Sequence, residues 1–528
     1  MAAKFDAIVI GSGFGGAVTA CRLAEAGLRV LVLERGRRWK STTYPRQPGD
    51  PWVWDQENPA ERNGWLDFRV QRGVCVALGA GVGGGSLIYA NVVVDAQPWL
   101  FDTGWPSEIS YSALQPHYQR VETMLHPRPV PASQEPERLK ILREAAEKLG
   151  YGNRFRPLPL AVTFDAAWKA DRHVPAPVYP LDSRPWVNEH GKQQGTCIHC
   201  GNCDIGCPVQ ARNTLDLNYL ARAESCGGEI RPLHMVRSIT PVNGGYRVEF
   251  DRIDDRGLLP GQETAARVIV AAGSLGSTEL LLRCRDVYHT LPQLSPVLGQ
   301  HWSANGDFLT ISVHDRPTYP TVGPTITAAI DFLDASQGGS RFFVEDGGFP
   351  EVFRAYFEHR NKFQLKNLEF NAMVLSLAFL LRRNGSIDQM MPWFAQGVDA
   401  ATGRLYLGSS WLRPWRKKLK LEWDRESTRR TTDAIFEMHK RLAEATGGRP
   451  LFPFFWTMLK TLITPHPLGG CAMGRTVEDG VVSHTGEVFG YRNFYVVDGS
   501  VVPRAIGLNP SKTIAALAER NAELMLQT

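Results

Sequence analysis

The stretch DAIVIGSGFGGAVTACRLAEAGLRVLVLERG, residues 6–36, decides the fold. The apolar run 7–10 predicts a strand, and a helical pattern after the glycines runs to Gly27, a residue type that commonly ends helices. A second apolar run, 29–34, predicts another strand. The glycines at GxGxxG spacing between the first strand and the helix are Gly11, Gly13 and Gly16. This order of elements is typical of a dinucleotide-binding unit.

Each glycine of this turn has a physical role. Gly11 permits the tight turn, Gly13 lets backbone N–H groups approach a pyrophosphate, and Gly16 lets the helix pack against the strand. Glu34 ends the second strand, where a carboxylate accepts hydrogen bonds from ribose hydroxyls. An acid at this place disfavours a 2′-phosphate, so the stretch predicts FAD or NAD without choosing between them.

Length and charge narrow the class of protein. A chain of 528 residues is too long for one compact core, so two or more domains are expected. The net charge of +5 is small for this length and predicts no nucleic-acid partner. The densest basic segment, WLRPWRKKLKLEW at 411–423, is interpreted as a solvated loop or edge, or as a contact with an anionic membrane surface.

No signal peptide is recognised in MAAKFDAIVIGSG at the N-terminus. The longest apolar run, which starts at Ala372 and is broken by Ser376, is shorter than the roughly 18 residues that a membrane span needs. We therefore expect a cytoplasmic protein, with peripheral contact at the inner membrane as the alternative. Its cysteines are expected to be reduced thiols.

A second glycine cluster, ALGAGVGGGSLIYANVVV, occupies residues 77–94. It has more backbone freedom than an ordinary turn requires. Either it is a tight loop between packed elements, or its small residues let the chain pass against a flat cofactor ring. The residues that would do so are Gly79, Gly83, Gly84, Gly85 and Ser86.

Two segments near the C-terminus complete a set of motifs: TPHPLGGCAMG (464–474) and NFYVVDGSVVPRAIGLNPSKTIAALAER (493–520). With them the chain resembles the glucose–methanol–choline (GMC) family of FAD oxidoreductases, and within it the cholesterol-oxidase-like branch. The resemblance covers nearly the whole chain. Further segments that carry it are WPSEISYSALQPHYQRVE (105–122) and VIVAAGSLGSTELLL (268–282), and RFFVEDGGFPEVFRAYF (341–357) resembles a family strand and turn near the active site.

The resemblance implies an α/β fold, α+β overall, in which a Rossmann-like domain binds FAD non-covalently. A substrate domain on a mixed or antiparallel sheet is inserted in it. The implied FAD-binding segments are 1–105, 205–303 and 464–528, and the substrate or cap segments are 106–204 and 304–463, with a Cys-rich loop at 195–208. Further FAD contacts implied by the resemblance are Asn91, Asp498, Pro510 and Thr513; for Asp498 an ordinary turn role is the alternative.

Alcohol oxidation needs a hydride acceptor, which flavin supplies, and a base for the hydroxyl proton. His466 stands out among the histidines because it lies between two prolines, three residues before the glycine pair Gly469 and Gly470. A neutral imidazole is a base near pH 7. Asn509, held extended by the following proline, could donate to the substrate oxygen or accept from it. The resemblance favours catalytic roles for both over ordinary structural ones.

A run of four cysteines, CxxCxxCxxxCP, has the spacing of a bacterial ferredoxin motif. The four are Cys197, Cys200, Cys203 and Cys207. The run predicts an iron–sulfur cluster, with zinc or unmetallated thiols packed beside the flavin domain as alternatives. A cluster near flavin would lead electrons away one at a time.

We therefore expect FAD-dependent oxidation of a hydrophobic alcohol, sterol-like, long-chain or aromatic, to the carbonyl, with electrons passing through the cluster to an acceptor protein or quinone. The aromatic segment LFPFFWTMLKTLITPHP, residues 451–467, is interpreted either as core or as the lining of an apolar channel. The alternatives are an oxidase that uses O₂ and has structural cysteines, or an electron-transfer subunit without substrate turnover.

Overall fold

The computed structural model describes residues 4–47, 49–168, 183–352, 386–410, 413–451 and 462–527, and for 410 and 413–415 the backbone alone. The apolar run that starts at Ala372 and most of the aromatic segment 451–467 lie outside the described residues. Among the helices that are described, none is long and apolar enough to cross a bilayer.

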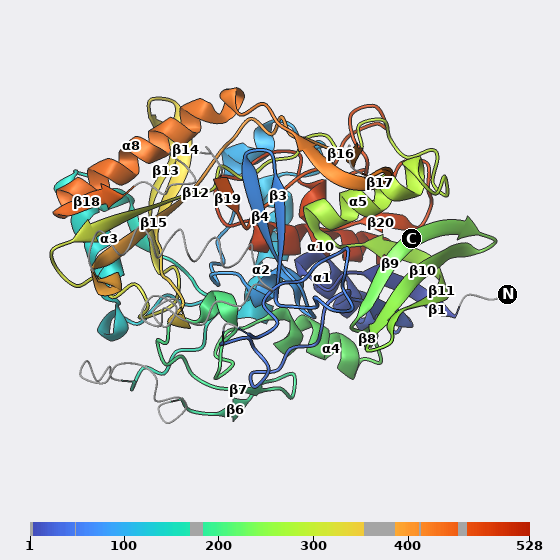
Figure 1. Cartoon of the computed structure of the whole chain (residues 1–528), viewed down its shortest axis with the longest axis horizontal. Coiled ribbons are helices and arrows are strands. Elements are labelled where there is room, and N and C mark those ends of the chain that lie inside the picture. The colour runs from blue at the N-terminus through green and yellow to red at the C-terminus, as the bar shows by residue number, and fades with distance from the viewer. Residues whose placement is uncertain are drawn as a thin grey trace.

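The first sheet contains the predicted dinucleotide-binding unit (Figure 1). Its strands are β1 (Phe5–Ile10), β2 (Val30–Leu33), β8 (Glu229–Arg231), β9 (His234–Val242), β10 (Gly245–Asp254), β11 (Gly257–Val270) and β20 (Phe494–Val496). The order is β8-β2-β1-β11-β10-β9, and β20 also pairs with β11. Five strands pair in parallel around β1 and β11, whereas β9, β10 and β11 form an antiparallel meander. The C-terminal β20 thus completes a sheet that starts at residue 5.

Helices from distant parts of the chain lie beside this sheet. They are α1 (Phe14–Glu25), α2 (Tyr111–Leu125), α4 (Tyr219–Ser225), α5 (Gly273–Asp286) and α10 (Ser511–Gln527). Four of them pack together, since α1 contacts α4 and α10, and α2 packs on α10. The buried Glu519 of α10 accepts hydrogen bonds from Arg22 of α1 and from the Tyr219 hydroxyl of α4. One carboxylate therefore ties three helices together.

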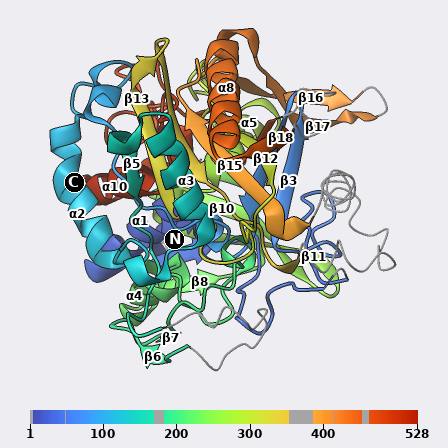
Figure 2. The same ribbon diagram turned by 90° about the vertical axis from the view of Figure 1, so that its left-hand side faces the viewer.

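The second sheet is antiparallel throughout, in the order β18-β12-β15-β14-β13-β5. Its strands are β5 (Phe155–Pro157), β12 (Phe308–His314), β13 (Ala328–Gln337), β14 (Ser340–Asp346), β15 (Met390–Gly397) and β18 (Gly448–Leu451). Helices α3 (Glu137–Lys148) and α8 (Arg429–Ala445) pack on it (Figure 2). One cluster of buried apolar side chains runs through both sheets, so they share a core.

Three smaller sheets complete the architecture: β3 (Leu66–Gln71), β4 (Val74–Gly79) and β19 (Leu462–Thr464); β6 (Trp186–Val187) and β7 (Gln193–Gln194); and β16 (Arg404–Ser410) and β17 (Arg413–Glu422). The basic segment 411–423 falls mainly on β17, where Arg416 and Lys418 pair with Glu57. The predicted fold class is confirmed, and the domain boundaries stay a prediction.

The tight packing of α1 against β1 depends on Gly16. A Cβ atom at Gly16 would lie 2.1 Å from the Gly11 carbonyl oxygen and 3.1 Å from the Ala271 Cβ atom. Backbone at that distance cannot yield without moving the helix away from the sheet. The structure therefore bears out the physical reason for which the sequence predicts glycine here.

Gly16→Ala should destabilise the protein by about 1–3 kcal/mol, the usual cost of overpacking, and should weaken retention of a bound nucleotide. Gly152→Ala is the matched control, because the nearest atom to its added Cβ would be the flexible Glu147 side chain at 3.7 Å. Thermal unfolding and nucleotide content of both variants test this. Equal melting temperatures for the two variants would contradict it.

Candidate active site

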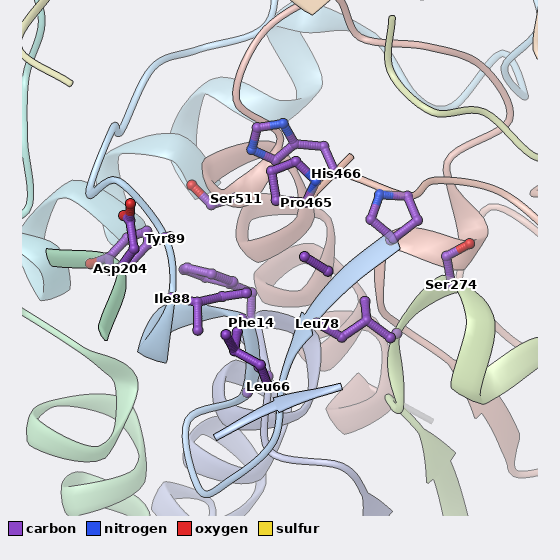
Figure 3. A pocket seen from close by; sticks show the side chains of 18 of the residues that line it. Phe14, Leu66, Leu78, Ile88, Tyr89, Asp204, Ser274, Pro465, His466 and Ser511 are labelled. Carbon is purple, nitrogen blue, oxygen red and sulfur yellow. The ribbon is translucent and has the colours of Figure 1, made fainter. Parts of the chain in front are cut away.

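A cavity of about 620 Å³ begins at the glycine turn between β1 and α1 and extends to the second sheet. Figure 3 shows some of the side chains that line it, among them Phe14, Asp204 and His466. At one end it is lined by the backbone of 10–15 and by Glu34. At the other end it is lined by Phe308 and Ile311 of β12 and Phe394 of β15. One continuous space therefore connects the nucleotide-binding turn with the core of the inserted sheet.

Glu34 is held rigidly at the nucleotide end. The backbone N–H and the hydroxyl of Ser12 donate to Glu34 Oε2 at 3.1 and 2.7 Å, and the N–H of Gly36 donates to Oε1 at 2.9 Å. A carboxylate has about four acceptor positions, so capacity remains for a ribose hydroxyl. Since Glu34 lines the cavity, its predicted role is compatible with this geometry.

The two glycine-rich turns touch each other. Gly84 has a positive φ of 51°, and a Cβ atom on it would lie 2.6 Å from the Gly13 Cα. Around a Cβ atom added to Gly85, by contrast, no atom lies within 4 Å, and around one added to Gly13 the nearest atom lies at 4.0 Å. Gly13 and Gly85 both line the cavity. Their bare backbone is a cradle that side chains would fill, as a dinucleotide with a flat ring requires.

The rest of the second glycine turn holds the cradle in shape. A Cβ atom at Gly79 would meet the Gly84 carbonyl oxygen at 2.5 Å, and Gly83 has a φ of 106°. The Ser86 hydroxyl donates to the Gly83 carbonyl at 2.8 Å and accepts from the Leu215 N–H at 3.1 Å. Gly79 lines the cavity, whereas Gly83 and Ser86 support the turn from behind.

Two of the remaining predicted contacts line the cavity and two do not. Asp498 and Pro510 line it, whereas Asn91 and Thr513 lie behind its wall. Asn91 has a φ of 67°, and its Oδ1 accepts from Arg212. The Thr513 hydroxyl lies 3.1 Å from the Tyr118 hydroxyl. Asn91 and Thr513 therefore support the wall in this structure.

Asp498 is fully enclosed by donors. It accepts from the backbone N–H groups of Gly273 and Ser500, both at 2.8 Å, and from the Ser277 hydroxyl. Burial raises the pKa of the Asp498 carboxyl, and these hydrogen bonds oppose the rise. The carboxylate joins the start of α5 to the turn after β20, and both segments contribute to the cavity wall.

His466 is oriented by an acid. Its Nδ1 lies 2.9 Å from Oδ1 of Asp307, a fully buried carboxyl to which the Thr464 hydroxyl donates at 2.6 Å. Burial raises the pKa of Asp307, and the bonds from His466 and Thr464 oppose the rise. A proton on Nδ1 leaves Nε2 as the basic ring atom. Because His466 lines the cavity, it has the geometry of an oriented general base.

Asn509 lines the same part of the cavity, directly before helix α10. It is only 5% exposed, and its Oδ1 has no hydrogen-bond partner among the described residues. A buried carbonyl oxygen without a partner costs free energy, so a ligand that donates to it is expected to bind there. His466 and Asn509, which the sequence analysis predicts together, thus line one cavity.

Glu345 is an acid that the sequence analysis did not single out. It lies on β14 and is fully buried, and its Oε2 accepts from the Gln396 amide at 2.8 Å. Burial raises the pKa of Glu345 to about 8, while Gln396 and Asn509 oppose the rise. A perturbed carboxyl beside Asn509 is a candidate for proton transfer. The signal in the sequence is the pair of acids at the end of the apolar strand FFVED.

The four cysteines of the predicted cluster lie in one partly buried loop. Cys197 accepts from the His199 N–H at 3.4 Å, and Cys207 accepts from the Ala211 N–H at 3.2 Å. Burial raises the pKa of the Cys197 and Cys203 thiols. Across the described ranges no three His, Cys, Asp or Glu side chains are placed to hold a metal ion. The cysteines as placed do not fit an iron–sulfur cluster or zinc.

Comparison with known proteins gives two family matches and similar proteins over the whole chain. Residues 400–518 match the GMC oxidoreductase family, and residues 9–53 match the NAD(P)-binding Rossmann-like domain. A cholesterol oxidase of Acinetobacter baumannii is 29% identical, with 98% of this chain and 93% of that protein covered. A cholesterol oxidase of Mycobacterium tuberculosis is 30% identical, with 99% and 91% covered.

The fold also matches solved structures. The crystal structure of pyridoxine 4-oxidase from Mesorbium loti aligns with a TM-score of 0.64 at 16% identity and covers 99% of this chain and 100% of that chain. At this identity the match shows the fold alone.

The buried Glu345 predicts a pH-dependent stability. With its pKa raised to about 8, the folded protein keeps a proton that the unfolded chain loses above about pH 4.5. Stability should fall between about pH 5 and 8, by up to about 1.4 kcal/mol per pH unit. Glu345→Gln removes this contribution, so the wild type should lose stability relative to the variant across that window. Melting curves of the two proteins that stay parallel from pH 5 to 8 would refute it.

Proposed function

Because the chain belongs to the GMC oxidoreductase family and is an FAD-dependent oxidoreductase, we propose that it oxidises a hydrophobic alcohol, sterol-like, long-chain or aromatic, to the carbonyl compound. The observation that carries this proposal is the single cavity that joins the glycine cradle to His466 and Asn509. Apolar side chains from both sheets line most of its wall, which suits a bulky apolar substrate. The two similar cholesterol oxidases support the same substrate class.

The residues that would hold FAD are those of the cradle and its rim. Gly13 and Gly85 offer bare backbone, and Glu34 lies at the ribose end. The first turn of α10 contributes Ser511 to the wall, and the positive end of a helix favours negative charge on a bound ring. When bound, the flavin supplies the hydride acceptor.

The chain's own residues would manage the proton. Nε2 of His466 accepts the proton of the substrate hydroxyl, while Asp307 on Nδ1 stabilises the resulting imidazolium. The Asn509 amide positions the hydroxyl, since its Oδ1 lacks a partner among the described residues. The hydride leaves the carbinol carbon as the O–H proton leaves the oxygen, which yields the carbonyl. Glu345, with its pKa raised to about 8 by burial, keeps its own proton near pH 7 and would not be the proton acceptor; it hydrogen-bonds with Asn509 from behind the cavity wall.

For the electron acceptor we propose O₂. The similar proteins named above are oxidases, and the placement of the four cysteines does not support the predicted iron–sulfur relay to an acceptor protein or quinone. No electron transfer step is assigned to the cysteine loop. A subunit without turnover is not favoured, because the oriented His466–Asp307 pair has no use in a pure conduit.

His466→Ala should leave FAD bound but slow anaerobic flavin reduction by an alcohol by about 10²-fold or more, the usual contribution of a positioned base. The cavity wall keeps its shape, so affinity for the cofactor should change little. His301→Ala is the control, because this exposed histidine does not line the cavity. Unchanged reduction in His466→Ala would remove the imidazole from the mechanism, and a wild type that no alcohol reduces would refute the proposed function.

Protein purified anaerobically should contain FAD with far less than one iron and one acid-labile sulfide per flavin, and its reduced flavin should consume O₂. The reason is that, in the part of the chain that the structure describes, no three His, Cys, Asp or Glu side chains are placed to hold a metal ion. Iron, sulfide and flavin analysis with the visible spectrum measures this. About three or four irons with matching sulfide per flavin would restore the predicted relay.

A further inference from the structure

The cysteine loop, residues 197–207, forms part of the cavity wall. Asp204 and Ile205 line the cavity. The backbone around them is held from outside, since Arg46 donates to the carbonyls of Ile205 and Gly206 at 2.7 and 2.6 Å, and Trp65 Nε1 donates to the Asp204 carbonyl at 3.2 Å. Asp204 is therefore presented to the cavity by a fixed main chain.

The opposite side of the loop packs against segments that line the substrate end. A Cβ atom at Gly201 would lie 2.2 Å from the Thr321 carbonyl oxygen and 3.3 Å from that of Phe349. The Gly323 N–H donates to the His199 carbonyl at 2.9 Å, and the Glu351 N–H donates to Asn202 Oδ1 at 3.2 Å. The loop and the segments 321–326 and 347–352 thus form one piece of wall.

The buried Arg138 fixes that piece of wall. Its guanidinium pairs with Asp346 at 2.7 Å, both side chains being fully buried. It also donates to four backbone carbonyls, those of Val322, Pro324, Thr325 and Gly347. Thr325 is therefore held as firmly as Asp204, on the neighbouring segment.

Asp204 and Thr325 both leave polar atoms without partners in this wall. Asp204 Oδ1 and Thr325 Oγ1 are shielded from solvent and have no hydrogen-bond partner among the described residues. Thr325 is 8% exposed. Its hydroxyl lies close enough to the Asp204 carboxyl to lower the pKa of that carboxyl, against the larger upward effect of burial. The two groups lie together in a wall that is otherwise mostly apolar.

The other acids that line the cavity are already in use. Glu34 accepts from Ser12 and Gly36, Glu279 accepts from Arg69 and Arg283, and Asp498 accepts from three donors. Among the described acids of this wall, Asp204 differs in having an oxygen without a partner. Such an oxygen needs a donor from whatever fills the cavity.

We propose that Asp204 and Thr325 form a polar subsite that binds a hydroxyl or protonated amine of the substrate, remote from the alcohol that His466 oxidises. This inference rests on the proposed function and narrows its substrate class to alcohols with a second hydrogen-bond donor. A site with buried polar groups discriminates strongly against an analogue that lacks the matching group. The cysteine loop then contributes to specificity through its aspartate.

The test compares straight-chain alcohols of increasing length, each beside its α,ω-diol and its ω-amino alcohol, in anaerobic flavin reduction by the holoenzyme. At one or more lengths the diol or amino alcohol should exceed the plain alcohol in kcat/KM by about tenfold or more. In Asp204→Asn, kcat/KM for the amino alcohol divided by kcat/KM for the plain alcohol should fall to near one. In Thr325→Val, the same ratio for the diol should be lower than in the wild type. Both variants should keep FAD.

Asp216→Asn is the matched control. Asp216 is half-buried, and its shielded Oδ1, like that of Asp204, has no hydrogen-bond partner among the described residues; it does not line the cavity, so the ratios should not change. Equal kcat/KM ratios in the wild type and Asp204→Asn overturn the inference. A loss of FAD or a changed flavin spectrum with unchanged ratios also overturns it, because it would place Asp204 against the cofactor. If Asp204→Asn does not fold, the Thr325→Val ratio decides. Flavin that no alcohol in the series reduces overturns the proposed function itself.

Discussion

The contact between two glycine turns determines the rest of the site. Gly13 and Gly84 come from segments about seventy residues apart, yet a single Cβ atom on Gly84 would lie 2.6 Å from the Gly13 Cα. Only bare backbone permits that approach, and it brings the open faces of Gly13 and Gly85 to one side. The nucleotide cradle is thus made by two turns that exclude side chains from each other, and the cavity begins where they meet.

Local patterns predict this part of the structure well, because the constraints that produce it are local. A strand, a GxGxxG turn and a helix are readable from spacing, and the reason for glycine at position 16 is a contact within the same turn. His466 and Asn509 could be named because each has an unusual backbone setting and because the family resemblance favours catalytic roles for both. That they line one cavity depends on the second sheet, whose pairing is not visible in any single segment.

The parts that sequence reasoning missed are those in which tertiary contacts decide the role. Glu345 is one of many acids until burial between β13 and β15 raises its pKa to about 8. Asn91 and Thr513 do not line the cavity and contact Arg212 and Tyr118, which the sequence could not show; their role toward the cofactor stays a prediction. The spacing of the four cysteines also matches that of an iron–sulfur motif. In the folded loop, backbone carbonyls accept hydrogen bonds from Arg46 and Trp65, and the Cys203 thiol is buried.

Three buried acids around the substrate end are distinguished by what surrounds them. Asp307 pairs with His466 and Thr464, and that pairing orients a base. Asp346 is neutralised by Arg138 and accepts from the N–H groups of Thr327 and Ala328, which makes it structural. Glu345 accepts from the Gln396 amide and has no cation beside it among the described residues, so it is the acid of the three whose pKa is raised to about 8. The three carboxyls thus have different roles because their partners differ. Asp307 orients His466, Asp346 supports the fold, and Glu345 holds a proton.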